Sequence, residues 1–237
     1  MNIEKNSYTF IFATIMVLIV AALLATTAIS LKPFQETNVA LEKKQNILSS
    51  IGVDVDRNIA DKEYSKYIIE ELVLNNKGEK LDGVAFDIDL AKQLKKEPDD
   101  QLLPLFVAKT ENGNKYIIPL RGKGLWGPIW GFMALNDDLN TVYGAVFDHK
   151  SETPGLGAEI NQYELFQKQF EGKEILNGNE LVSITVIKGG APEGDKHGVD
   201  GISGGTITSD GVTDMLLERL TMYESYFRNN QLKFVYE

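Results

Sequence analysis

The sequence predicts an α+β protein with one N-terminal transmembrane helix, followed by one soluble domain with a mainly antiparallel sheet and flanking helices. Three observations predict this class. An uncharged apolar run opens the chain, short segments of strand-forming residues separated by turn residues fill its second half, and an amphipathic helical pattern closes it. A length of 237 residues is sufficient for one ordinary domain in addition to a membrane span.

The apolar run covers residues 8–31 and contains no charged residue, no glycine and no proline. As a helix it would be about 36 Å long, at about 1.5 Å per residue, which crosses a hydrocarbon core of about 30 Å with some tilt. The apolar region of a cleaved signal peptide is about half as long. We therefore expect residues 1–7 to be a short tail and residues 8–31 to remain in the lipid bilayer as an anchor.

Residues 32–60 are expected to form a stalk helix and a linker. Apolar residues lie among charged ones between Asn38 and Ile51, and Gly52 is expected to end the helix. Residues 61–237 are assigned to the soluble domain. Helices are expected at 61–71, where the end could instead turn into a strand at 70–74, and at 90–96 and 159–170. Strands are expected at 102–108, 115–120, 129–135, 142–147 and 180–188.

Charge and cysteine content exclude several classes of function. The formal net charge is −10, so nucleic acid would be repelled and is not an expected partner. Without cysteine there can be no disulfide, no thiolate nucleophile and no cysteine-ligated zinc or iron–sulfur centre. The two histidines, His149 and His197, are isolated in the sequence, and we expect no metal site.

The most informative segment is residues 200–208, which places hydroxyl groups and a glycine pair before a helix that Ser209 is expected to cap. Unpaired N–H groups and the helix dipole at such a position favour a bound phosphate. An ordinary capped turn explains the same residues. The helix should have one apolar face, composed of Val212, Met215, Leu216, Leu220, Tyr223 and Phe227.

Three parts of the chain, which together span nearly all of it, resemble the C subunit of the Na⁺-translocating NADH:quinone reductases. They are residues 31–38 with 45–48, residues 124–131 with 152–159, and residues 200–208. The last resembles the flavinylation signature Asp-x-x-Ser/Thr-Gly-Ala-Thr. The resemblance implies that Thr206 carries FMN through a phosphoester, supported by Asp200, Ser203 and Gly204. Gly205 replaces the usual alanine, a change we expect to be tolerated, and Thr208 is the alternative acceptor.

The resemblance also implies the walls of the flavin pocket. Glu152, Thr153, Gly155 and Leu156 belong to a Pro/Gly-rich bend that is equally explained as a simple change of chain direction. The resemblance makes Thr153 a polar contact and places Leu156 against the flavin ring. Trp126 and Trp130 are candidates to stack on the ring, although tryptophans are commonly core residues.

The same residues admit other interpretations. Residues 201–205 match G-x-S-x-G, but in hydrolases of that type the histidine follows the serine, and both histidines here precede Ser203. The G subunit of the Rnf complexes also resembles residues 152–157 and 200–206, whereas residues 38–48 favour the quinone reductase. A third alternative is a non-redox, membrane-anchored binding module that holds its ligand noncovalently.

The resemblance implies a protein that relays electrons from NADH toward quinone, such as ubiquinone, in a Na⁺-pumping complex of the bacterial inner membrane. Its expected partners are other membrane subunits and a flavin transferase. We expect no strand-linked G-x-G-x-x-G or G-x-x-x-x-G-K-S/T motif, so NADH binding is assigned elsewhere. Lys5 and the terminal amine precede the span, whereas Lys32, Lys43 and Lys44 follow it. This small excess of positive charge after the span weakly favours a cytoplasmic domain. The resemblance places it in the periplasm.

Overall fold

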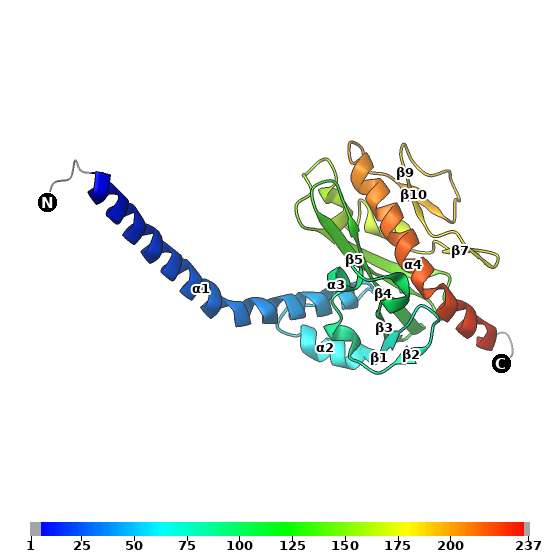
Figure 1. Cartoon of the computed structure of the whole chain (residues 1–237). Coiled ribbons are helices and arrows are strands. Elements are labelled where there is room, and N and C mark those ends of the chain that lie inside the picture. Colours follow the sequence, from blue (N-terminus) through cyan, green and yellow to red (C-terminus); the bar gives the residue numbers. More distant parts are fainter. Residues whose placement is uncertain (1–5, 235–237) are drawn as a thin grey trace. The chain divides into compact units, whose positions relative to one another are not determined.

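The structure is a computed structural model that describes residues 6–234, together with the side chains up to Asn230. Lys5 and most of the tail expected at residues 1–7 lie outside the described residues. The chain divides into two compact units, Met1–Lys43 and Lys44–Glu237 (Figure 1). The second unit begins within the segment that the sequence assigns to the stalk and linker, because Ile47 and Leu48 are completely buried in it.

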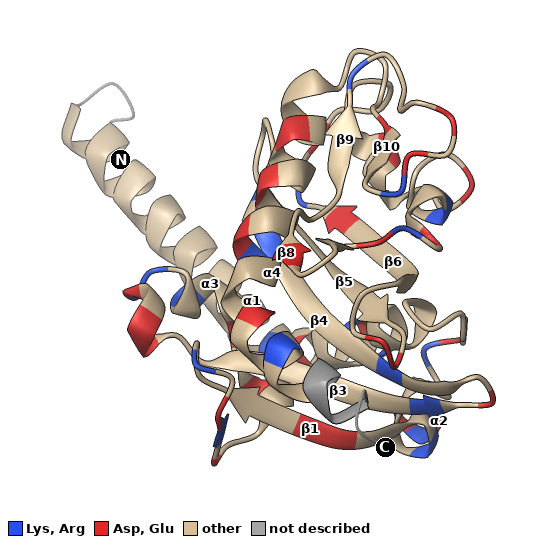
Figure 2. Cartoon of the chain, turned by 90° about the vertical axis from the view of Figure 1, so that its right-hand side faces the viewer, with Lys and Arg blue, Asp and Glu red and all other residues tan. Residues whose placement is uncertain are grey.

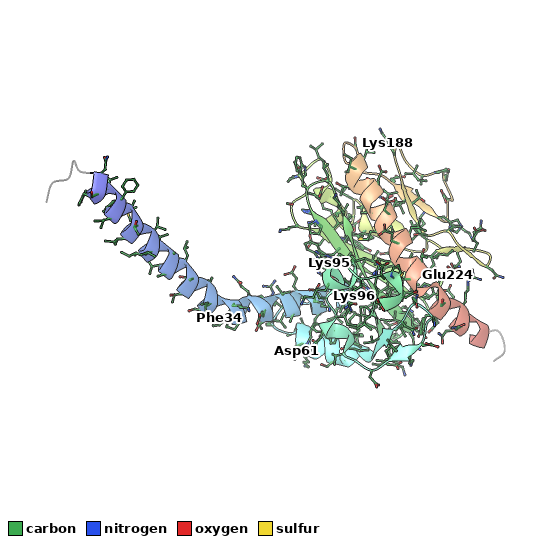
Figure 3. The ribbon with its side chains drawn as sticks, in the orientation of Figure 1. Phe34, Asp61, Lys95, Lys96, Lys188 and Glu224 are labelled. Carbon is green, nitrogen blue, oxygen red and sulfur yellow. The ribbon has the colours of Figure 1, made fainter. Side chains whose placement is uncertain are left out.

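Helix α1 (Asn6–Ser49) is one continuous helix, so the expectation of separate helices at 8–31 and 38–51 is wrong. Pro33 lies inside it, where proline removes one backbone hydrogen bond without ending the helix. The first part of α1 is long and apolar enough to cross a membrane, and its apolar side chains are exposed. Phe34, just beyond the predicted span, is 68% exposed (Figure 3).

Up to residue 234, the second unit contains short helices, one long helix and ten strands. The remaining helices are α2 (Ala60–Tyr67), α3 (Leu90–Gln93) and α4 (Thr206–Phe234), with 3₁₀ helices η1 (Ala85–Asp87), η2 (Pro98–Asp100), η3 (Ala158–Asn161) and η4 (Gln167–Phe170). The strands are β1 (Ile68–Leu74), β2 (Lys80–Leu81), β3 (Leu103–Thr110), β4 (Gly113–Lys123), β5 (Pro128–Leu135), β6 (Val142–His149), β7 (Leu176–Asn177), β8 (Glu180–Leu181), β9 (Thr185–Ile187) and β10 (Gly198–Asp200).

Six strands form one antiparallel sheet in the order β2-β1-β3-β4-β5-β6. Strand β6 is therefore an edge strand (Figure 2). The four strands expected between residues 102 and 147 are confirmed as β3 to β6. Their order follows from the short turns between them, since consecutive strands joined by tight turns pair as antiparallel neighbours.

The sheet is covered on both faces, because side chains of each strand point alternately to opposite sides. Helix α4 packs on one face (Figure 1), and its six expected core residues are all at most 1% exposed. The end of α1 and helix α2 pack on the other face around Phe106, Ile117 and Phe132. This arrangement confirms the predicted fold class and places the start of α4 above one end of β4.

The helix expected at 159–170 is wrong. The segment forms η3, a turn and η4 instead. Ile160, Phe166 and Phe170 are all buried against β6. In an α-helix, residues six positions apart lie about 120° apart around the axis, so Ile160 and Phe166 would not share one face. Tertiary packing therefore selects the tighter, interrupted conformation.

Three other expected elements differ from the structure. The strand expected at 180–188 is broken into β8 and β9 at Ser183, which has a positive φ of 61°. The helix expected at 61–71 ends at Tyr67, and β1 follows directly, as in the alternative of a helix turning into a strand. Helix α3 is also shorter than expected.

Candidate functional site

Three segments that are distant in the sequence meet at the start of α4. Glu152, which is 5% exposed, lies in one of them and forms hydrogen bonds with the other two. Its Oε1 accepts a hydrogen bond from Trp126 N–H at 2.9 Å, and its Oε2 accepts one from the Thr208 hydroxyl at 2.8 Å. One buried carboxylate thereby joins the β4–β5 loop, the segment after β6 and the first turn of α4.

The helix begins earlier than the sequence indicates. Helix α4 starts at Thr206, and Ser209 lies inside its first turn, where Ser209 N–H donates to Gly205 C=O at 2.9 Å. The expectation that Ser209 caps the helix is therefore wrong. Its hydroxyl instead accepts a weak hydrogen bond from Ile202 N–H at 3.3 Å. This contact holds the turn at residues 202–205 against the helix.

The two threonines of the motif have different environments. Thr208 is completely buried and its hydroxyl is already hydrogen-bonded to Glu152. Thr206 is only partly buried, and its hydroxyl has no hydrogen-bond partner within residues 6–234. The N–H groups of residues 206–208 also have no acceptor in this part of the chain. A hydroxyl and three N–H groups are thus available where a helix start favours an anion.

Glycines allow the loops to approach this helix start. Gly204 has a φ of +80°, and a Cβ there would lie 2.8 Å from Leu156 Cδ2. A Cβ on Gly157 would lie 2.5 Å from the Thr208 hydroxyl. A Cβ on Gly211 would lie 2.3 Å from Lys123 C=O, which shows how closely α4 passes β4. At these three positions, any larger residue would therefore clash with a side chain or with the backbone of the facing segment.

The two adjacent glycines should respond differently to alanine. We expect Gly204→Ala to lower the free energy of unfolding by about 1–2 kcal/mol, because its φ is in the left-handed region, and to reduce flavin loading. Gly205 has no such φ, and a Cβ there meets Ile202 and Leu156 at 3.0–3.2 Å, so small shifts accommodate it. Gly205→Ala should behave like the wild type. Thermal unfolding of both variants measures the difference, and equal losses would contradict it.

Glu159 holds the loop that carries Leu156. Its carboxylate accepts hydrogen bonds from Gly155 N–H and Gly157 N–H. Partial burial raises the pKa of the Glu159 carboxyl, but the hydrogen bonds from these backbone N–H groups lower it by more, so the net pKa is below its ordinary value. The ionised carboxylate is thus the form that fixes this wall of the site.

This hydrogen bonding predicts a pH dependence. A carboxyl group whose pKa is lower in the folded state contributes stability above its unfolded pKa of about 4.3, and that stability is lost as pH falls through the folded pKa. We expect Glu159→Gln to have a lower Tm than the wild type near pH 6. The difference should shrink below pH about 4. A Tm difference that stays constant down to pH about 3 would contradict this role.

The other predicted site residues differ in exposure and in position. Asp200 is exposed and its carboxylate accepts a hydrogen bond from Ala191 N–H, so it orders the preceding loop. Ser203 and Thr153 are also exposed. Trp126 and Leu156 are 65% and 49% exposed beside the helix start. Trp130 lies on β5 next to Ile129, so its side chain projects from the sheet face opposite to α4.

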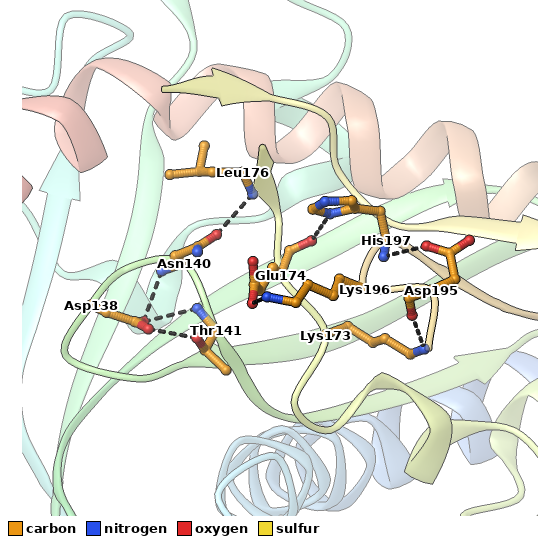
Figure 4. A network of polar contacts seen from close by, with 9 residues as sticks. All are labelled: Asp138, Asn140, Thr141, Lys173, Glu174, Leu176, Asp195, Lys196 and His197. Atoms are coloured by element: carbon orange, nitrogen blue, oxygen red, sulfur yellow. Dashed lines mark hydrogen bonds and ion pairs between the residues drawn. The ribbon is translucent and has the colours of Figure 1, made fainter. Parts of the chain in front are cut away.

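A polar network positions the strand that leads into the motif (Figure 4). His197, which precedes β10, bonds through Nδ1 to Glu174 C=O at 2.7 Å, and Lys196 forms an ion pair with Glu174. Asn140 Oδ1 accepts from Leu176 N–H, which links the β5–β6 turn to β7. His197 is therefore a structural residue. Beyond β9, Lys188 is exposed near the start of α4 (Figure 3).

Sequence reasoning missed His149 and Glu159 as parts of the site. His149 Nδ1 accepts from Glu152 N–H at 3.1 Å, while its buried Nε2 has no partner among the described residues. Glu159 lies only four residues beyond Gly155, a spacing that could have indicated a local carboxylate–amide contact. Nothing in the sequence indicated the role of His149.

The expectation that no strand-linked G-x-G-x-x-G occurs is wrong, because one segment has this spacing. Gly122, Gly124 and Gly127 match G-x-G-x-x-G, but they join antiparallel strands β4 and β5. Dinucleotide binding by this motif requires a helix start after the last glycine, which β5 replaces here. In this segment, Trp126 N–H instead donates a hydrogen bond to Glu152.

Comparisons with known proteins agree with this geometry. Residues 124–221 match the model of the FMN-binding domain family, which includes all three segments. The C subunit of the Na⁺-translocating NADH-quinone reductase from Vibrio vulnificus is 34% identical over 82% of this chain and 83% of the relative. The corresponding protein of Haemophilus ducreyi is 33% identical over 89% and 88%. The chain belongs to the family of C subunits of the Na⁺-translocating NADH-quinone reductases.

Solved structures support membership in this family, whose members are also called NqrC. The crystal structure of the C subunit from Parabacteroides distasonis is 43% identical, has a TM-score of 0.78, and covers 83% of this chain and 96% of that chain. NqrC of Shewanella oneidensis has the same fold, with a TM-score of 0.69, 24% identity, and coverage of 81% and 98%. This NqrC family member is thus an FMN-binding part of a multi-subunit redox complex, with one candidate membrane helix among the described residues.

Proposed function

We propose that this NqrC family member holds FMN covalently on Thr206 and relays electrons from NADH toward quinone within a Na⁺-pumping complex. The observation that carries the proposal is the difference between the two threonine hydroxyls. The Thr206 hydroxyl is accessible and has no hydrogen-bond partner within residues 6–234, whereas the Thr208 hydroxyl is buried and donates a hydrogen bond to Glu152. Of these two threonines, Thr206 is the one whose hydroxyl a transferase can reach without unfolding the first turn of α4.

The residues around Thr206 suit a phosphodiester. The link forms when the threonine oxygen bonds to the flavin phosphorus, the donor's previous substituent leaves, and the hydroxyl proton passes to a base of the transferase. One negative charge remains, and the N–H groups of residues 206–208 and the helix dipole stabilise it. Glu152 does not compete for these N–H groups, because its oxygens bind Trp126 and Thr208.

The remaining residues would bind and orient the flavin. FMN supplies the redox chemistry, since it accepts and donates electrons. Leu156 and Trp126 provide exposed apolar surface on two loops that Glu152 and Glu159 hold in place. Thr153 offers an exposed hydroxyl on the same bend. Because Trp130 lies on the other sheet face, Trp126 is the tryptophan that we assign to the flavin ring.

Coexpression of the full chain with a flavin transferase tests the covalent cofactor. We expect a fluorescent band at the mass of this chain on a denaturing gel, since a phosphoester survives denaturation. A dark band in the presence of active transferase would refute the covalent link. Flavin absorbance that disappears after denaturation would support the alternative of a noncovalent binding module.

Other membrane subunits are the proposed partners, and NADH oxidation is assigned to one of them. The G-x-G-x-x-G spacing of this chain lacks the helix that would bind a dinucleotide. The relatives named above are C subunits of the quinone reductase, which favours that complex over the Rnf complex and its G subunit. Reduction of quinone by the assembled complex, lost with an apo-form of this protein, is the corresponding functional measurement.

The soluble domain is proposed to face the periplasm, with residues 8–31 in the inner membrane. A reporter fused to Glu237 that is active only in one compartment tests this topology. We expect a periplasm-dependent phosphatase to be active and a cytoplasm-dependent fluorescent protein to be dark. The reverse pattern would overturn the assignment and agree with the slight excess of lysine after the span.

A further inference from the structure

The edge strand β6 has an open section that nothing in the described chain pairs with. Lys150 N–H donates a hydrogen bond to Pro128 C=O at 3.1 Å. Hydrogen-bonded and non-hydrogen-bonded positions alternate along an antiparallel pair, so the backbone groups of residues 146 and 148 also point toward β5. Those of residues 145 and 147 therefore point outward. Gln167 Nε2 donates a hydrogen bond to Phe147 C=O at 2.9 Å, and the backbone of Val142 forms hydrogen bonds with residues 172–173. Ala145 N–H, Ala145 C=O and Phe147 N–H have no partner within residues 6–234.

These unpaired groups lie in a groove of about 700 Å³ within the second unit. Its walls are the end of α1 with the following turn, and the connection from η3 to η4. Natural proteins usually cover or block an exposed edge, because it is a template for an additional strand. Here both ends of the edge are covered, and the middle lies at the floor of the groove, where Ala145 and Phe147 line it but are only 5% and 1% exposed. An extended segment that enters the groove would reach these unpaired groups.

The groove is negatively charged. Its charged lining residues are Asp54, Asp148 and Glu171, with no lysine or arginine among the residues that line it. The Tyr163 hydroxyl donates to Glu171 at 2.7 Å, and the hydrogen bond with Glu171, burial and the charges of nearby acids raise the pKa of Tyr163 to about 12. Charge complementarity therefore selects a cationic partner and disfavours a second copy of this acidic chain.

We propose that this groove binds a short extended segment, rich in lysine or arginine, of another polypeptide in the membrane complex, which adds a strand to β6. The segment would exchange hydrogen bonds with Ala145 and accept one from Phe147 N–H, while its cationic side chains face Asp54, Asp148 and Glu171. The proposal concerns an assembly surface and does not depend on how FMN is attached.

Photocrosslinking in the intact complex tests the partner. A benzoylphenylalanine replaces Tyr163, which lines the groove, and in the control it replaces Leu165, which is exposed but outside the groove. We expect the Tyr163 probe to crosslink to a peptide of another subunit with a net positive charge. A crosslink to lipid, to a second copy, or to an uncharged or acidic peptide would overturn the proposal. So would a yield no higher than that of the Leu165 control.

Amide variants test the charge without removing hydrogen-bond acceptors. The variant Asp54→Asn/Asp148→Asn/Glu171→Gln should lower the Tyr163 crosslinking yield about fivefold or more. The control Asp82→Asn/Asp100→Asn/Glu193→Gln removes the same charge from exposed positions outside the groove and should leave the yield unchanged. In hydrogen exchange, Ala145 and Phe147 amides should be protected about tenfold or more by assembly. Equal exchange rates in the complex and in the isolated full chain would refute strand addition.

Discussion

Thr206→Ala is expected to abolish covalent flavin while the fold is retained. The substitution removes the only hydroxyl of the first turn of α4 that is both accessible and unpartnered within residues 6–234. Alanine is a good helix residue and removes no hydrogen bond made by the Thr206 side chain. Flavin fluorescence of this protein on a denaturing gel should therefore be lost, while the circular dichroism spectrum and Tm remain close to those of the wild type.

Two matched variants complete this test. Thr206→Ser keeps a hydroxyl at the same position and should retain fluorescence. Thr208→Val keeps the shape of the buried side chain but leaves Glu152 Oε2 without its donor, which costs about 1–3 kcal/mol of stability. We expect it to lower Tm and to keep the covalent flavin. Fluorescence that persists in Thr206→Ala and disappears in Thr208→Val would make Thr208 the acceptor.

Phe147→Ala is expected to cause the largest loss of stability. Phe147 is 1% exposed, and its ring lies 4.9 Å from that of Phe170 and 5.8 Å from that of Phe166, measured between centroids. Removal of a buried phenylalanine from such a cluster costs about 3–5 kcal/mol. For a domain of this size that corresponds to a decrease in Tm of about 6–20 °C.

Denaturant unfolding of the full chain in detergent measures this loss, with the fluorescence of Trp126 and Trp130 as the signal. Leu165→Ala is the control, because Leu165 is 63% exposed in the same segment and should change stability by less than about 0.5 kcal/mol. A loss below about 1 kcal/mol for Phe147→Ala would mean that η3 and η4 are not packed on β6 in solution.

Local signals in the sequence were sufficient for most of the fold. Four strands were predicted because alternation and turn residues act within a few positions, and the core face of α4 followed from helical spacing. The segment at 159–170 failed for a non-local reason. Its conformation is set by the need to bury Ile160, Phe166 and Phe170 against β6, which no local pattern contains.

The site divides in the same way. The fold class and the candidate membrane span were predictable from composition and from the order of neighbouring residues, and the two threonines were predicted from the resemblance of residues 200–208 to the flavinylation signature. The start of α4 at Thr206 and the orientation of Trp130 away from α4 depend on tertiary packing. The different environments of the two hydroxyls depend on it too, because Glu152 lies 56 positions before Thr208 in the chain and reaches it only after β6 and α4 have packed.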